Sequence, residues 1–168
     1  MSKSQIMRLR AREALHDANL AADKLELCVE PSVIRIYWTA AVTLTRTAMD
    51  VLHKVDSENS TQFAAQVKKQ WKTIQANENG EHDIFWHFIK AERDMLAHQY
   101  RHNAELTWGL LLAEDGKGML TEAGERIVCE QDFFLLNDGI YANHDGRDIL
   151  RDALKWVDQR ITEIERAI

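Results

Sequence analysis

The sequence predicts an all-α protein, an up-and-down bundle of four to five long helices with a small β-hairpin. Apolar residues recur at steps of three and four over several long stretches, which is the spacing of one helix face. The chain holds one proline and seven glycines, whereas a fold of many strands needs a turn residue about every ten positions. A length of 168 residues suits one domain, and no linker divides it, so we expect a single domain over residues 1–168.

The limits of the expected helices follow from the apolar spacing and from the polar breaks between the runs. In chain order, the helices are expected at about Ser4–Leu27, Ser32–Val55, Thr61–Gln75, Asp83–His102 and Arg147 to the end. The second helix begins after Pro31, a residue that suits the first turn of a helix. It is apolar over much of its circumference, which indicates burial against several neighbours. Its polar strip consists of Thr39, Thr43, Arg46 and Asp50.

Residues 105–146 break the helical pattern and are expected to form an insertion before the last helix. Leu106–Ala113 is short and apolar, Glu114–Gly118 has the composition of a turn, and Met119 and Leu120 follow, which predicts a β-hairpin. Thr121–Asn137 is compatible with a short helix or with irregular structure. Such an insertion could cover a cleft, select a substrate or dock a partner.

The composition excludes several classes of protein. A formal charge of −6 argues against a protein that coats nucleic acid without specificity, but it permits a small local site for RNA. No run of about 18 apolar residues occurs, so we expect no contact with a membrane. The N-terminus lacks the apolar core of a secretory signal, and the two cysteines lack metal-binding spacing. We therefore expect a cytoplasmic protein.

The fourth helix carries the most informative residues of the chain. Four of the seven histidines fall between residues 82 and 102, at positions 82, 87, 98 and 102. Its expected core face is Phe85, Phe88, Ile89, Glu92, Leu96 and Gln99. The opposite face carries His87, Lys90, Asp94, His98 and Arg101. Arg93 and Tyr100 are seven residues apart and so share a second line, and Trp86 and Tyr100 are expected to be exposed beside the polar face, as on a contact surface.

The octapeptide Arg93–Tyr100 resembles the R-x4-H-x-Y signature of HEPN domains (higher eukaryotes and prokaryotes nucleotide-binding), in particular the HepT-like toxins. The family prefers a polar residue directly after the arginine, which Asp94 supplies. The resemblance implies a HEPN-like bundle and a metal-independent endoribonuclease of toxin-antitoxin or defence type, without a cofactor. It also implies that a nucleotidyltransferase antitoxin modifies Tyr100 with AMP.

The chemistry of RNA cleavage suits the residue types in this motif. Attack by the 2′-hydroxyl of the RNA needs a base, an acid for the leaving 5′-oxygen, and a cation for the developing charge. His98 is suited to proton transfer and Arg93 to the charge of the phosphate, while Asp94 could orient His98 and Tyr100 could contact phosphate or a base.

One chain supplies only one histidine of the motif, and Arg93 and His98 lie about 140° apart around a helix. RNA cleavage, however, requires both a general acid and a general base. A two-fold dimer that brings two copies of the fourth helix together solves both problems. We therefore expect a homodimer with RNA as its substrate.

Three other interpretations of the same residues remain open. The polar face is also typical of a solvated helix, in which Asp94 and His98 form an ordinary i,i+4 pair. A HEPN-like domain without catalysis could act as a dimerisation or nucleotide-binding module. Asp94, His98 and His102 also follow the spacing D-x3-H-x3-H, which would suit a metal-binding helical bundle.

Overall fold

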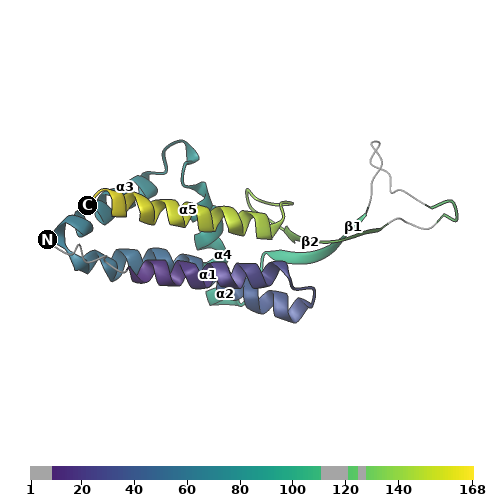
Figure 1. Cartoon of the computed structure of the whole chain (residues 1–168). Helices are drawn as coiled ribbons and strands as arrows, with labels where there is room; N and C mark the ends of the chain where they lie inside the picture. Colours follow the sequence, from purple (N-terminus) through teal and green to yellow (C-terminus); the bar gives the residue numbers. More distant parts are fainter. Residues whose placement is uncertain (1–8, 111–120, 125–127) are drawn as a thin grey trace.

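The protein is mostly helical, with one small antiparallel sheet (Figure 1). The computed structural model describes residues 9–110, 121–124 and 128–168. Within these ranges lie five α-helices and two β-strands. The predicted combination of a helical bundle and a small hairpin is thereby confirmed. No described helix is long and apolar enough to cross a membrane.

Helices α1 (Arg10–Glu26) and α2 (Pro31–Lys54) pack against each other more extensively than any other two described helices. The buried residues of α1 recur at steps of three and four and are mostly small, which lets α1 lie close to α2: Ala11, Leu15, Ala18, Ala21, Ala22 and Leu25. Helix α2 starts at Pro31, one residue before the predicted Ser32, and the Glu30 carboxylate accepts hydrogen bonds from the backbone N–H groups of Ser32 and Val33. Helix α1 begins at Arg10, and the expected start at Ser4 lies outside the described residues.

A carboxylate from a distant segment caps the start of α1. The local N-cap residue, Leu9, has no side-chain acceptor. Asp56, at the start of the short helix η1 (Asp56–Asn59), is 3% exposed and accepts hydrogen bonds from the backbone N–H groups of Arg10 (3.1 Å) and Ala11 (2.9 Å). The end of α2 is thus tied to the beginning of α1.

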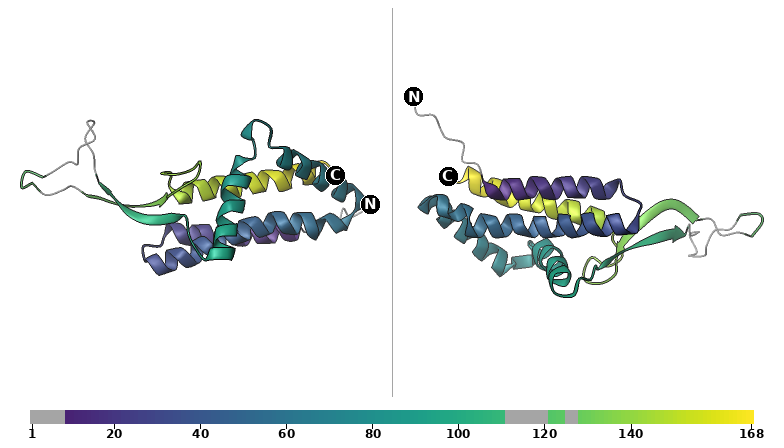
Figure 2. Two further views of the ribbon diagram at one scale, coloured as in Figure 1. Left: turned by 180° about the vertical axis from the view of Figure 1, so that it is seen from behind. Right: turned by 90° about the horizontal axis from the view of Figure 1, so that it is seen from below.

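Helices α3 (Thr61–Ala76) and α5 (Gly146–Arg166) complete the bundle. The Ser60 hydroxyl accepts from the N–H of Phe63 and caps α3. Five residues of the predicted apolar stripe of α5 are buried: Leu150, Leu154, Val157, Ile161 and Ile164. The sixth, Ile168, lies beyond the end of α5 and is 47% exposed. Figure 1 shows α5 running beside α1, and Figure 2 shows the same pair from two further sides.

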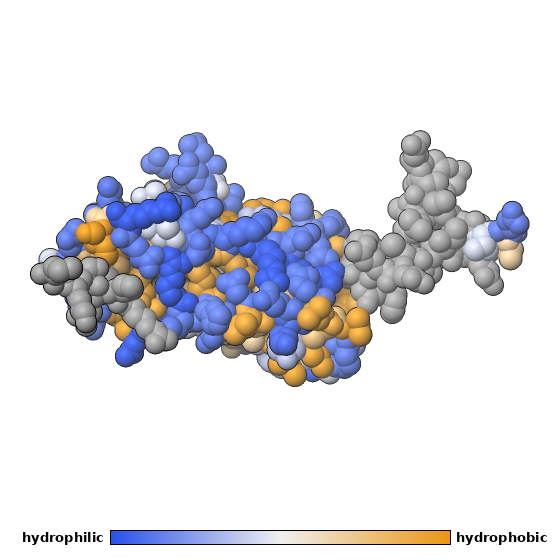
Figure 3. Space-filling view, viewed as in Figure 1, coloured by the Kyte–Doolittle hydropathy of each residue, from blue (hydrophilic) through white to orange (hydrophobic). Residues whose placement is uncertain are grey.

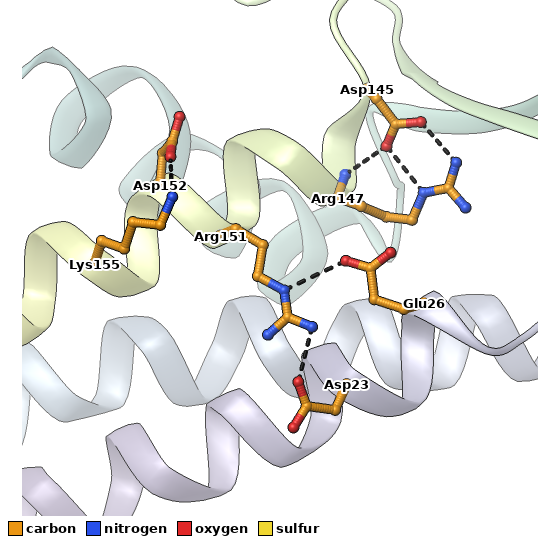
Figure 4. Close-up of polar contacts among 7 residues, drawn as sticks. All are labelled: Asp23, Glu26, Asp145, Arg147, Arg151, Asp152 and Lys155. Atoms are coloured by element: carbon orange, nitrogen blue, oxygen red, sulfur yellow. Dashed lines mark hydrogen bonds and ion pairs between the residues drawn. The ribbon is translucent and has the colours of Figure 1, made fainter.

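Ion pairs join α5 to α1 on the surface of the bundle (Figure 4). Arg151 of α5 donates to Asp23 (2.8 Å) and Glu26 (3.3 Å) of α1. At the start of α5, Asp145 accepts from the backbone N–H of Arg147 and also binds its guanidinium. The Arg151 contacts join the two helices on a face that is largely hydrophilic (Figure 3), and they add little stability at exposed positions.

The fourth helical segment differs from the prediction in two ways. It consists of a π-helix, η3 (Ile84–Lys90), followed by α4 (Ala91–Gln99), with the connecting turn η2 (Glu78–Gly80) before it. It also ends at Gln99 and not at His102, because Tyr100 takes a left-handed conformation (φ 49°) and its N–H bonds to the carbonyl of Leu96. The segment crosses the bundle, with η3 against α5 and α4 against α2 (Figure 2).

The sheet corrects the prediction for the insertion. Strand β1 (Ala104–Leu110) pairs with β2 (Val128–Leu136) in antiparallel register, with Ala104 opposite Leu136. The predicted second strand at Met119 and Leu120 lies outside the described residues. Neither a short helix nor irregular structure describes residues 128–136, because pairing with β1 makes them a strand. The two strands extend away from the bundle (Figure 1).

The base of this hairpin is packed into the core through Trp38. The ring of Trp38 is fully buried and meets Phe134 edge to face at 4.9 Å and Phe88 at 5.8 Å. Gly146 lies against the same rings, since a Cβ atom there would come within 3.1 Å of Trp38 Cη2 and 3.2 Å of Phe134 Cδ1. The start of α5 and the base of the sheet therefore both contact Trp38 in the N-terminal part of α2.

Candidate functional site

A chain of alternating charges joins α2 to α4. Arg46 Nη2 lies 3.0 Å from Asp50 Oδ1 on α2, and Arg93 Nη2 of α4 lies 3.9 Å from Asp50 Oδ2. Arg93 Nη1 donates to Asp94 Oδ1 (2.8 Å), and Lys90 Nζ donates to Asp94 Oδ2 (2.9 Å). Three cations and two carboxylates therefore gather where the two helices meet.

Arg46 is the most buried member of this chain. Its side chain is 16% exposed, and its guanidinium carbon lies 4.9 Å from the centre of the Phe85 ring. Burial lowers the pKa of Arg46, while Asp50 opposes that effect. One of its terminal nitrogens is buried without a hydrogen-bond partner. The sequence places Arg46 on the polar strip of the second helix, four residues before Asp50, but its approach to Phe85 depends on how α2 and η3 cross.

Asp94 is held by two cations. Burial opposes ionisation of its carboxyl group, but the hydrogen bond and charge of Lys90, together with the charge of Arg93, outweigh that effect and lower its pKa. Both carboxylate oxygens are engaged by these two neighbours. The orientation of His98 by Asp94 stays a prediction.

Arg93, His98 and Tyr100 differ in their exposure. The Arg93 side chain is 34% exposed, and His98 is exposed on the last turn of α4. Tyr100 is 69% exposed, and its ring lies 5.8 Å from the ring of His102. Because Tyr100 lies beyond the end of α4, the prediction that it continues the line of Arg93 on one helix is wrong.

Two side chains of the predicted faces lie elsewhere than expected. Trp86 is half-buried, its Nε1 donates to the carbonyl of Ile74 (2.8 Å), and its ring lies 6.3 Å from Trp71. It therefore fastens η3 to α3, and the expectation of an exposed Trp86 is wrong. Gln99, expected in the core, is exposed at the end of α4.

The structure also shows a buried carboxyl group whose environment the sequence does not reveal. Glu92 is 2% exposed, next to Trp38 and Asn103, and burial raises its pKa against the opposing effect of Asn103 and Trp38. Its Oε2 atom has no hydrogen-bond partner. The apolar spacing of the helix placed Glu92 at the edge of the core face, and that is the only signal of its burial.

The three residues with metal-ligand spacing do not share one helix face. Asp94 and His98 lie on α4, whereas His102 follows the end of that helix. Within the described ranges, no group of three or more histidine, cysteine, aspartate or glutamate side chains is arranged to hold a metal ion. The spacing D-x3-H-x3-H therefore does not place Asp94, His98 and His102 on one helix face, as the metal-binding alternative requires.

Comparison of the chain with protein-family models, with curated proteins and with solved structures finds no match.

Proposed function

We propose that the protein is a HEPN-like, metal-independent endoribonuclease of toxin-antitoxin or defence type. The observation that carries the proposal is the placement of Arg93 and His98 on α4. The guanidinium of Arg93 lies between Asp50 and Asp94 in the charge chain and is partly exposed, and His98 is exposed one to two turns further on. A fixed cation and an accessible imidazole are groups that transesterification of RNA requires.

In the proposed reaction, the 2′-oxygen of the RNA attacks the adjacent phosphorus and the bond to the 5′-oxygen breaks. One histidine takes the proton of the 2′-hydroxyl, and a second group gives a proton to the departing 5′-oxygen. Arg93 stabilises the charge on the phosphorane, and Lys90 and Asp94 hold Arg93 in place. The products are a 2′,3′-cyclic phosphate and a free 5′-hydroxyl.

The second proton-transfer group comes from a second copy of the chain in this proposal. His98 and Tyr100 are exposed at the end of α4, where a two-fold axis would bring two His98 side chains into one cleft. Sedimentation equilibrium is expected to show a two-chain species. A mass that stays that of one chain at micromolar concentration would contradict the shared cleft.

Tyr100 is the proposed target of a nucleotidyltransferase antitoxin. Its ring is 69% exposed, so the hydroxyl group is accessible to a modifying enzyme. The variant Tyr100→Phe lacks the hydroxyl group that would receive AMP and is therefore expected to resist silencing by such a partner.

RNA cleavage in the presence of EDTA tests the reaction. Wild type is expected to cleave, His98→Ala to lose about 10²–10⁴-fold in rate, and Arg93→Ala to lose about 10²–10³-fold. His87→Ala, an exposed histidine in η3, and Arg166→Ala, at the end of α5, serve as matched controls and should cleave as wild type.

A second candidate is an inactive dimerisation or nucleotide-binding module. It is favoured by the pairing of Arg93 with Asp94 and Asp50, which already offsets the charge of the guanidinium. Absence of cleavage by wild type under all conditions, with a stable dimer, would select this candidate over the nuclease.

A further inference from the structure

A cavity of about 350 Å³ opens between the first turns of α2 and the base of the hairpin. Its walls are apolar and partly aromatic, made by Ile34, Trp38, Leu106 and Phe134. This volume lies at the low end of the range for small-molecule pockets. A mainly apolar cavity of this size can hold one planar ring system, such as a nucleobase.

His102 lines this cavity with two unused hydrogen-bonding atoms. Both ring nitrogens are buried, and neither has a hydrogen-bond partner among the residues that the structure describes. Burial, and secondarily the charge of Arg35, lower the pKa of His102, so the ring is neutral near pH 7. A neutral imidazole offers one donor and one acceptor. Because buried polar atoms are normally paired, this ring is prepared for a ligand with a complementary polar edge.

The rim of the cavity carries one charge of each sign. Arg35 and Glu105 are both exposed there. The Arg35 guanidinium is exposed at this rim and can bind a phosphate. The Glu105 carboxylate can accept from the exocyclic amine of a base. The two rim charges thus complement the two ends of a nucleotide.

A polar strip of α2 connects this cavity to the charge chain at Arg93. At about 100° per residue, the strip covers about 80° of the helix circumference. It consists of Arg35, Thr39, Thr43, Arg46 and Asp50. Arg93 approaches Asp50 at one end (3.9 Å), and the cavity opens beside Arg35 at the other.

The two ends of the strip are separated by a length that suits a short run of nucleotides. Fifteen residues of helix between Arg35 and Asp50 span about 22 Å. A stacked strand that rises about 3.4 Å per nucleotide covers this distance in about six or seven nucleotides. The ring of His102 also lies 5.8 Å from that of Tyr100, the last residue of the motif.

We propose that the cavity between α2 and the hairpin binds one nucleotide, with its base against His102 and the Leu106 side chain and its phosphate on Arg35. The source of that nucleotide rests on the proposed function: it belongs to the RNA strand, several positions from the cleaved bond. The cavity would then select which RNA is cut, while Arg93 and His98 cut it.

Isothermal titration of the full chain with the four nucleoside 5′-monophosphates, the matching nucleosides and inorganic phosphate tests the site. At least one monophosphate is expected to bind once per chain. His102→Phe keeps the ring but removes both nitrogens, and should weaken binding at least tenfold. Arg35→Gln should weaken the monophosphate about fivefold and leave the nucleoside unchanged. Arg166→Gln, at the far end of α5, is the control and should bind as wild type.

Several outcomes would overturn the site. These are the absence of binding by every monophosphate, equal binding by inorganic phosphate alone, or unchanged affinity in both variants. Arg35 is exposed, so Arg35→Gln keeps the test valid if His102→Phe does not fold, which thermal unfolding will show.

Cleavage kinetics separate this inference from the proposed function. If RNA is the source, His102→Phe and Arg35→Gln raise KM for an oligonucleotide and leave kcat nearly unchanged. Nucleotide binding without any cleavage by wild type would contradict the proposed nuclease activity and would leave the cavity as a binding site for free nucleotides. Cleavage with unchanged KM in both variants would overturn the RNA source.

Discussion

At the scale of single residues, two carboxyl groups of α4, those of Glu92 and Asp94, have opposite environments. Asp94 is surrounded by cations and its pKa is lowered, whereas Glu92, two residues earlier, is buried among apolar groups and its pKa is raised. The two side chains differ by about 160° in direction around the helix, since α4 turns about 100° per residue, and so face different environments. Asp94 can hold Arg93, and Glu92 costs stability when it ionises.

Replacement of the buried carboxyl group by an amide should raise stability at alkaline pH. A group whose pKa is raised on folding contributes stability below its unfolded pKa and loses it as pH rises through the folded value. Glu92→Gln removes that loss, so the variant should gain about 1 kcal/mol over wild type at pH 8.5, and less toward pH 5. Urea unfolding at both values measures the gain. An advantage that does not change with pH would contradict the buried charge.

At the scale of elements, distant contacts decide where helices begin and end. Asp56 caps α1 from 45 residues away in the chain. Phe134 and Gly146 bring β2 and the start of α5 against Trp38. These contacts join elements that do not follow one another in sequence.

Removal of the distant cap should destabilise the protein. Asp56→Ala leaves two backbone N–H groups of α1 without their acceptor and should cost about 1–2 kcal/mol in the free energy of unfolding. Asp56→Asn keeps an oxygen acceptor and should cost less. Chemical denaturation compares the two, and equal stability of Asp56→Ala and wild type would show that the cap contributes nothing.

A methyl group added at the start of α5 should disturb the same junction that lines the proposed nucleotide cavity. The Cβ of Gly146→Ala would lie 3.1–3.3 Å from Trp38 and Phe134, so the rings must move. We expect a loss of about 1 kcal/mol, typical of an overpacked core, and a changed fluorescence of the buried Trp38. A variant as stable as wild type, with an unchanged spectrum, would show that the junction is loosely packed.

At the scale of the whole molecule, three partly or fully buried histidines make stability depend on pH. His82 is 2% exposed with its ring 5.8 Å from that of Trp156, and His53 packs on Trp71. Burial lowers the pKa of His53, His82 and His102. Nearby charges modify this effect at His82, where Arg160 acts in the same direction and Glu81 and Glu163 oppose it.

The sign of the expected pH dependence follows from these lowered pKa values. The unfolded chain takes up protons near pH 6.5, above the folded pKa values, so the histidine contribution is complete above about pH 6.5 and is lost as pH falls below it. The loss is at most about 1.4 kcal/mol per pH unit for each histidine. Glu92 acts in the opposite direction over part of this range.

Urea unfolding at pH 7.5 and pH 5.5 should therefore show lower stability at the acid value. His82→Phe keeps a ring in contact with Trp156 and should reduce the difference. His16→Gln, on the exposed side of α1, is the matched control. A pH dependence that is identical in wild type and His82→Phe would exclude His82 as its source.

Much of the helical architecture could be predicted because it depends on local patterning. The helices at α1, α2, α3 and α5 follow from apolar spacing, and the start of α2 follows from Pro31. The same spacing placed Arg93, Asp94 and His98 on one helix, which α4 confirms.

Which side chains recur on which helix face follows from the local sequence, because that periodicity is a property of the local chain. Which of those faces meet depends on tertiary packing. That packing tied Trp86 to α3, paired residues 128–136 as a strand and linked Arg93 to Asp50. Each of these depends on contacts between segments far apart in the chain, whose free energy is gained only when the elements pack together.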